Sequence, residues 1–136
     1  MNEKHRLHPQ SPYAASKVAS DSLALSYFRS FDTPVVVVRP FNTFGPRQST
    51  RAVIPTIFRQ LMDTGELKLG ALTPRRDFTY VTDTARGFIE LAQCDSAIGE
   101  TVNLGTGISH SIEEIAGTCM KICLLYTSPS PRDVRS

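Results

Sequence analysis

The chain has 136 residues, of which 40% are hydrophobic, 21% charged and 8% aromatic, as in one ordinary soluble domain or part of one. Its 15 basic and 13 acidic side chains give a formal net charge of +2, and the basic residues are scattered, which argues against a nucleic-acid or anionic-membrane partner. No apolar run approaches the roughly 20 residues of a membrane helix, and no signal-peptide core is present. A cytoplasmic protein is therefore expected.

The first predicted element is a helix that begins after Ser11 and ends near Phe31. Ser11 is a suitable N-cap and Pro12 suits the first helical position. Residues 32–34 then break the helix, and residues 35–38 form an uninterrupted β-branched run without polar alternation. Such a run is typical of a parallel strand covered on both faces.

Residues 39–51 contain prolines and a glycine among polar residues and predict a loop. A helix is expected over residues 52–63 with an apolar side, and Thr64 and Gly65 end it. Short strands are expected at residues 67–69 and 77–81.

The next helix is expected to begin at Asp83 as N-cap and to reach about Gln93, with four residues spaced to cover a core: Ala85, Phe88, Ile89 and Ala92. Residues 101–104 predict another strand. A last helix follows Ser111, where Glu114 three residues later completes a capping box.

Residues 122–136 depart from helical periodicity into a Pro- and Ser-rich tail, which is expected to be disordered. This tail also resembles translated sequencing-adapter sequence and is therefore interpreted as non-native, with a natural flexible C-terminus as the alternative. The cysteines Cys94, Cys119 and Cys123 are odd in number and form no CxxC pair. Neither a disulfide framework nor a metal site is predicted.

The alternation of helices and strands predicts an α/β fold with only two candidate parallel strands, residues 35–38 and 101–104. The sequence contains no GxGxxG or GxxGxxG turn to hold a dinucleotide pyrophosphate. The chain is therefore expected to be the C-terminal part of a larger protein.

Tyr13 and Lys17 lie four residues apart, on one face of the first predicted helix. A nearby ammonium stabilises a phenolate, which makes a tyrosine usable as an acid/base near neutrality. The alternative is an amphipathic helix with a solvated lysine, because this spacing also occurs by chance in many helices.

Three motifs occur in order: SPYAASK, RPFNTFGPRQ and RRDFTYVTD, with NLGTG after them. Over about residues 9–121 the sequence closely resembles the NAD-dependent epimerase/dehydratase family, the extended short-chain dehydrogenases that act on nucleotide sugars. The resemblance implies a Rossmann-type fold without its Gly-rich N-terminal half. Residues 1–45 would end the NAD-binding domain, residues 46–121 would form a substrate-binding region interleaved with the last Rossmann elements, and residues 122–136 the tail.

The resemblance also implies roles for residues near the cofactor. Tyr13 would be the catalytic acid/base, and Lys17 would bind the nicotinamide ribose and favour the phenolate. Pro40 and Phe41 would lie beside NAD. Asn42 would donate a hydrogen bond to the substrate diphosphate, although a loop-capping asparagine is the alternative.

Arg76 matches the family's diphosphate-binding arginine, a role that suits a planar fork of donors. Val53 and Leu69 resemble positions near the nucleotide base, with core packing as an almost equal alternative. Asp77 and Tyr80 are interpreted as structural residues.

The sequence most resembles the 4,6-dehydratases that act on UDP-N-acetylglucosamine in nonulosonic (legionaminic-type) acid pathways. A nucleotide-sugar 4-epimerase and a UDP-glucuronate decarboxylase of the same family remain open, because the family places the deciding residues upstream of Tyr13. A catalytically inactive fragment or binding module is the alternative of another class. The helix over residues 11–31 carries many small side chains, and the family resemblance implies that the complete enzyme is a homodimer that packs through this helix.

Overall fold

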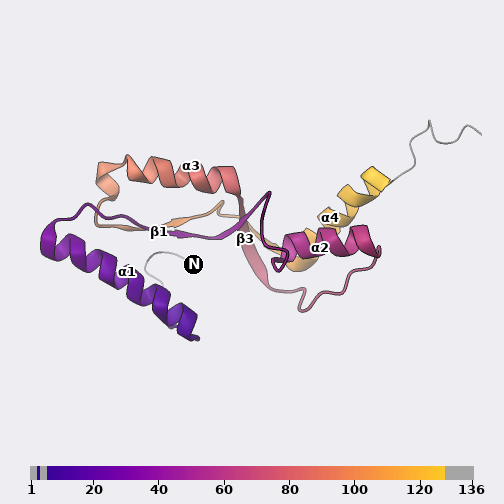
Figure 1. Ribbon diagram of the computed structural model, residues 1–136, viewed down its shortest axis with the longest axis horizontal. Helices are drawn as coiled ribbons and strands as arrows, with labels where there is room; N and C mark the ends of the chain where they lie inside the picture. Colours follow the sequence, from indigo (N-terminus) through magenta and orange to yellow (C-terminus); the bar gives the residue numbers. More distant parts are fainter. Residues whose placement is uncertain (1–2, 4–5, 128–136) are drawn as a thin grey trace, which may run out of the picture. The chain divides into compact units, whose positions relative to one another are not determined.

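The computed structural model describes residue 3 and residues 6–127. Helices and strands alternate through these residues in the order α1 (Pro12–Phe31), β1 (Val37–Pro40), β2 (Asn42–Phe44), α2 (Val53–Asp63), β3 (Arg75–Tyr80), α3 (Val81–Ala92), a 3₁₀ turn (Asp95–Ala97), β4 (Thr101–Leu104), β5 (Ser109–Ser111) and α4 (Ile112–Thr127) (Figure 1). The chain is thus of the α/β class, as predicted. It divides into two compact units, one of residues up to 43 with 79–106 and one of residues 44–78 with those from 107 on.

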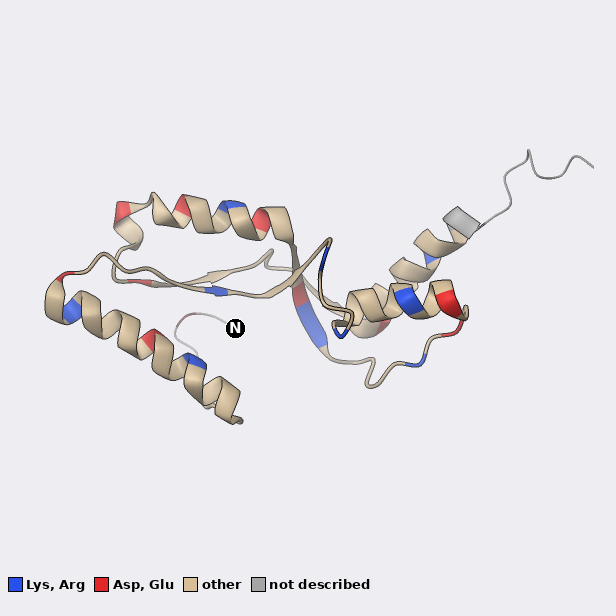
Figure 2. Cartoon of the chain, in the orientation of Figure 1, with Lys and Arg blue, Asp and Glu red and all other residues tan. Residues whose placement is uncertain are grey.

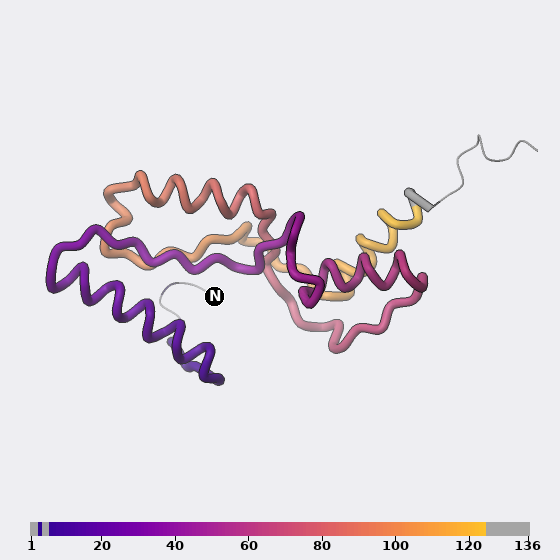
Figure 3. The backbone as a smooth tube through the Cα atoms, viewed as in Figure 1, coloured from indigo at the N-terminus to yellow at the C-terminus, as the bar shows by residue number. Residues whose placement is uncertain are grey.

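The sheet of the first unit consists of β1 and β4, which pair in parallel with Val37 opposite Thr101 and Pro40 opposite Leu104. The two strands run side by side between α1 and α3 (Figures 1 and 3). The predicted parallel pair is confirmed. The first strand begins two residues later than expected, because the regular ladder starts at Val37; before it, Gly99 N–H donates to the Val35 carbonyl over 2.7 Å.

Both ends of α1 are as predicted. The Ser11 hydroxyl accepts a hydrogen bond from the Ala14 N–H over 3.1 Å, and Pro12 occupies the first turn. At the other end, Asp32 adopts the left-handed conformation (φ 51°) and its N–H donates to the Phe28 carbonyl over 3.0 Å. The helix therefore starts and stops through local chemistry.

No residue of α1 is fully buried, and two rows of its side chains differ in exposure. The half-buried row repeats at helical spacing and comprises Ala14, Val18, Asp21, Ala24, Leu25 and Phe28. The exposed row follows an exact four-residue step and comprises Ala15, Ala19, Leu23, Tyr27 and Phe31, of which Leu23 is 62% and Phe31 71% exposed. We call these five residues the exposed row.

Helix α3 departs from the sequence prediction at its start and in its packing. It begins at Val81 with Tyr80 as N-cap, so Asp83 is not the N-cap; it lies in the first turn and pairs with Arg86 over 2.8 Å. The residues expected to cover a core stay largely exposed, with Ile89 at 59%. The helix contacts the sheet through Gly87 instead, where an added Cβ would lie 2.5 Å from Leu104 Cδ1.

The second unit has its core between α2 and α4, around Ile57, Ala116 and Cys119. Ile57 is the fully buried large side chain of this core (0% exposed). The predicted helix over residues 52–63 is confirmed as α2, and Gly65 follows its end with a φ of 71°.

The strand predicted at residues 67–69 is wrong. The backbone of Lys68 does not pair with a strand but with the side-chain amide of Gln60, through bonds of 2.6 Å to Lys68 N–H and 3.2 Å to its carbonyl. Leu67 and Leu69 still pack against the α2–α4 core.

A second sheet has the order β2-β3-β5, with β3 and β5 antiparallel. Residues 39–51 were expected to form a loop, but they contain the end of β1 and all of β2. The strand expected at residues 77–81 is β3, which begins earlier, and β5 was not predicted.

The final helix is capped as predicted. Ser111 Oγ accepts from the Glu114 N–H and Glu114 Oε2 accepts from the Ser111 N–H, both over 3.1 Å. This reciprocal pair is a capping box. The helix continues to Thr127, beyond the end expected near residue 122, while residues 128–136 of the predicted tail lie outside the described residues.

Candidate functional site

Tyr13 and Lys17 meet on the N-terminal half of α1. The Lys17 Nζ lies 5.6 Å from the centroid of the Tyr13 ring, within the range of a cation–π contact. Tyr13 is 73% exposed, and in the described part of the chain its hydroxyl makes no hydrogen bond. The pair therefore presents an accessible phenol with an ammonium beside it.

An ion pair fixes this helix to the sheet. Arg39 Nε of β1 donates to Asp21 Oδ2 of α1 over 2.8 Å, and both side chains are about three-quarters buried (27% and 25% exposed). Helix α1 and strand β1 are in contact and run in opposite directions (Figure 1), so the start of α1, which carries Tyr13, lies toward the carboxyl end of β1. The sequence analysis did not identify this pair, whose residues are separated by 18 positions.

Pro40, Phe41 and Asn42 follow one another at that carboxyl end. Pro40 is the last residue of β1, the Phe41 N–H donates to the Leu104 carbonyl over 2.9 Å, and Asn42 is exposed at the start of β2. In α/β sheets, ligands bind outside the carboxyl ends of parallel strands. The location suits the cofactor and substrate roles predicted for these three residues, which stay predictions.

Arg76 lies in the second unit, on β3. Its Nη1 donates to the Arg75 carbonyl over 2.9 Å, and among the described residues it has no carboxylate partner. Charges of both signs are otherwise spread along the chain (Figure 2). An exposed guanidinium with donors to spare can bind an anion.

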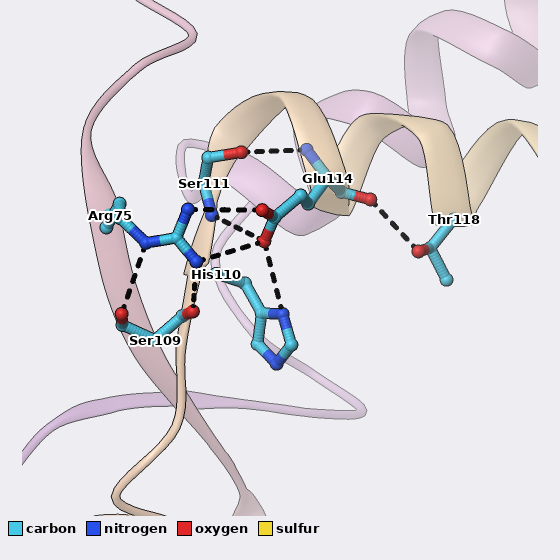
Figure 4. A network of polar contacts seen from close by, with 6 residues as sticks. All are labelled: Arg75, Ser109, His110, Ser111, Glu114 and Thr118. Atoms are coloured by element: carbon cyan, nitrogen blue, oxygen red, sulfur yellow. Dashed lines mark hydrogen bonds and ion pairs between the residues drawn. The ribbon is translucent and has the colours of Figure 1, made fainter.

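The neighbouring Arg75 is fully engaged. Its guanidinium makes a two-pronged ion pair with Glu114 (3.1 Å and 3.4 Å) and donates to the carbonyl of Ser109 over 2.6 Å and to its hydroxyl over 3.2 Å (Figure 4). His110 Nδ1 lies 3.4 Å from the same carboxylate. Sequence reasoning missed this network, since Arg75 and Glu114 are 39 positions apart.

These contacts lower the pKa of Glu114 below its ordinary value. The largest cause is the hydrogen bond from the Ser111 backbone N–H, followed by the Arg75 side chain, while partial burial acts in the opposite direction. Glu114 is therefore held as a carboxylate by two different elements.

Val53 and Leu69 both pack against the α2–α4 core. This contact is what the core-packing alternative expects, and the predicted role near a nucleotide base stays a prediction. Asp77 was interpreted as a structural residue, and its Oδ2 accepts a 2.8 Å hydrogen bond from the Gly107 N–H. No helix in the described ranges is long and apolar enough to cross a membrane.

Comparisons with known proteins identify the relatives of the chain. Residues 1–128 match the family model described as GDP-mannose 4,6 dehydratase. A dTDP-glucose 4,6-dehydratase from Actinoplanes sp. is 37% identical over 122 residues, which cover 89% of this chain and 38% of that relative.

Two solved structures resemble the chain closely. The dTDP-glucose 4,6-dehydratase from Bacillus anthracis, in complex with NAD, has a TM-score of 0.82 and 29% identity over 99% of this chain and 42% of its own. A UDP-glucuronic acid 4-epimerase variant from Bacillus cereus, in complex with NAD and a UDP-sugar analogue, has a TM-score of 0.83 and 31% identity. The match covers 90% of this chain and 40% of the epimerase chain. The chain spans less than half the length of each of these three relatives. With a family match over nearly its whole length, the chain belongs to the NAD-dependent epimerase/dehydratase family, among proteins similar to the GDP-mannose and dTDP-glucose 4,6-dehydratases.

Proposed function

We propose that this chain is part of an NAD-dependent 4,6-dehydratase that acts on a nucleoside diphosphate sugar, and that it supplies the acid/base tyrosine of that enzyme. The observation that supports the proposal most directly is the accessible Tyr13 phenol with the Lys17 ammonium beside it. The 4,6-dehydratase relatives named above support the reaction class.

The residues present are compatible with NAD. Tyr13 and Lys17 offer a hydroxyl and an ammonium from one helix face, a donor set suited to ribose hydroxyls, and Pro40 and Phe41 lie at the carboxyl end of a parallel strand. When bound, NAD supplies a hydride acceptor for C4 of the sugar. Tyr13 and Lys17 are the residues proposed to hold the nicotinamide end.

The proposed chemistry of this chain concerns one proton. The Tyr13 phenolate takes the proton of the C4 hydroxyl while the hydride leaves C4, which gives a 4-keto sugar. Lys17 stabilises the phenolate. The family motifs assign contacts with the diphosphate to Asn42 and, separately, to Arg76. The 4-keto group acidifies the proton on C5, so that water can be eliminated across C5 and C6.

A nucleotide-sugar 4-epimerase is the second candidate, and the resemblance to the Bacillus cereus UDP-glucuronic acid 4-epimerase favours it. It uses the same C4 oxidation by Tyr13 without the elimination. The three relatives named above are two dTDP-glucose 4,6-dehydratases and a UDP-glucuronic acid 4-epimerase, so they do not support UDP-N-acetylglucosamine as the substrate or a decarboxylation as the reaction. The nucleotide and the sugar are therefore left open in our proposal.

Replacement of Arg76 by alanine tests the proposed substrate class. The Arg76→Ala chain is expected to bind UDP, dTDP and GDP roughly 10- to 100-fold more weakly, the cost of a lost charge-assisted hydrogen bond. Calorimetric titration of the three nucleotides measures the change. Arg59→Ala is the matched control, because Arg59 is an exposed arginine of the same unit, and it should leave the affinities unchanged. Equal losses in both variants would contradict a diphosphate role for Arg76.

We also propose that the complete protein is a homodimer joined through the exposed row of α1. Three large apolar side chains of that row, Leu23, Tyr27 and Phe31, are each more than half exposed, which is unusual for a solvent-facing helix side. Leu23→Glu should shift the complete protein from dimer to monomer in light scattering at micromolar concentration. Ser22→Glu, at an exposed position outside the row, is the control. A dimer that survives Leu23→Glu would contradict this interface.

A further inference from the structure

The carboxylate of Glu114 joins three elements of the second unit. It accepts the Ser111 N–H at the junction of β5 and α4, and it receives both prongs of the Arg75 guanidinium from β3. Arg75 in turn donates to both the hydroxyl and the carbonyl of Ser109 on β5 (Figure 4). Arg75 therefore fixes the start of β3 against β5 and the first turn of α4.

Arg76 is adjacent to this arrangement and contacts the main chain of Arg75. It is the next residue of β3, opposite His110 in the antiparallel register. The one hydrogen bond that its side chain makes within the described residues runs from Nη1 to the Arg75 carbonyl. The guanidinium of Arg76 is thus hydrogen-bonded to the main chain of Arg75, and the side chain of Arg75 is held by Glu114.

We propose that the Arg75–Glu114 ion pair is a positioning element, which holds the Arg76 guanidinium in place for the diphosphate of a nucleotide. The inference rests on the proposed function, in which Arg76 binds that diphosphate. The ion-pair side chains are about half exposed (52% and 49%), so the pair itself stabilises the fold little. We infer that the ion pair serves orientation instead: Arg75 is held by Glu114, and the adjacent Arg76 is left to bind the diphosphate.

Simple electrostatics predicts the opposite effect for removal of this carboxylate. Loss of a negative charge near Arg76 raises the local positive potential and should strengthen the binding of an anion. Positioning predicts weaker binding, because Arg76 then loses its defined orientation. The sign of the change separates the two explanations.

Glu114→Gln is the informative variant. Glutamine still serves in a capping box, so the start of α4 is kept while the charge that holds Arg75 is lost. Glu113→Gln makes the same change of net charge one residue away, at an exposed side chain that makes no ion pair within the described residues. We expect the Glu114→Gln chain to bind dTDP, UDP and GDP about three- to fivefold more weakly, the scale of a surface charge pair. Glu113→Gln should bind them as well as the wild type or slightly better.

A double-mutant cycle with Arg76→Ala distinguishes positioning from a general structural effect. If Glu114 acts through Arg76, adding Glu114→Gln to the Arg76→Ala chain should weaken binding no further. A full additional loss in the double variant, or unchanged or tighter binding by Glu114→Gln alone, would overturn the inference while leaving the role of Arg76 intact. Unchanged affinity in Arg76→Ala, or no measurable nucleotide binding by the wild-type chain, contradicts the proposed function itself. Thermal unfolding of each variant verifies that it is folded.

Discussion

Replacement of Tyr13 by phenylalanine in the complete protein is expected to slow the oxidation of the sugar at C4 by about 100-fold or more, the usual cost of removing a general acid/base. The ring and its contact with the Lys17 ammonium remain, so only the group that accepts the proton is lost. Affinity for the nucleotide sugar should stay within a factor of about two, since the diphosphate contacts are elsewhere in the sequence. Single-turnover absorbance of the reduced cofactor measures the rate, and calorimetry measures the affinity.

Tyr27→Phe is the matched control for this substitution. Tyr27 is a second exposed tyrosine of α1 (51% exposed), and its ring lies against Phe31 with 5.5 Å between centroids. Loss of its hydroxyl should leave C4 oxidation unchanged. A Tyr13→Phe protein that oxidises the sugar at nearly the wild-type rate would show that another group accepts the proton.

Ile57→Ala is expected to have the largest effect on stability, a loss of about 2–5 kcal/mol in the free energy of unfolding. Ile57 is completely buried where α2 packs against α4, with Ala116 and Cys119 as its buried neighbours. Truncation removes buried methyl and methylene groups and leaves a cavity, which adds to the lost transfer free energy. Urea unfolding followed by circular dichroism measures the change.

Met62→Ala provides the comparison for Ile57→Ala. Met62 lies on the same helix and is 69% exposed, so its truncation should change the free energy of unfolding by no more than about 0.5 kcal/mol. Similar losses in the two variants would mean that Ile57 does not contribute more to the core than a surface residue does.

The elements that could be predicted from the sequence are those with local start and stop signals. Helix α1 has a serine cap and a proline at its start, and the capping box of Ser111 and Glu114 marks the start of α4. The parallel strand β4 was predicted with its exact bounds from a short apolar-containing run. In each case, residues within a few positions of one another carry the signal.

The short strands β2 and β5 could not be predicted for the same reason. Each has only three residues. They form strands because each pairs with β3, and their own composition does not indicate a strand. Residues 67–69 show the converse case. Their alternation of apolar and polar residues suits a strand, but the backbone of Lys68 bonds to the side chain of Gln60 and not to another strand.

The candidate site divides in the same way. The Tyr13–Lys17 pair follows from helical spacing alone, and the structure brings the two side chains together. The ion pairs of Arg39 with Asp21 and of Arg75 with Glu114 join residues far apart in sequence, and no sequence motif predicts them. A resemblance to a family points to residues that touch ligands, whereas the residues that orient those side chains become visible only in three dimensions.

The contact between Phe28 and Gly99 in the first unit has a consequence for how this sequence can vary. Gly99 has a φ of 84°, and a Cβ added there would lie 2.6 Å from Cζ of the Phe28 ring. An L-residue at position 99 would therefore suffer both backbone strain and a steric overlap with the ring. A smaller side chain at position 28 would remove only the overlap. Position 99 should thus tolerate exchange less than position 28, and a residue other than glycine there should occur only together with a smaller partner on α1.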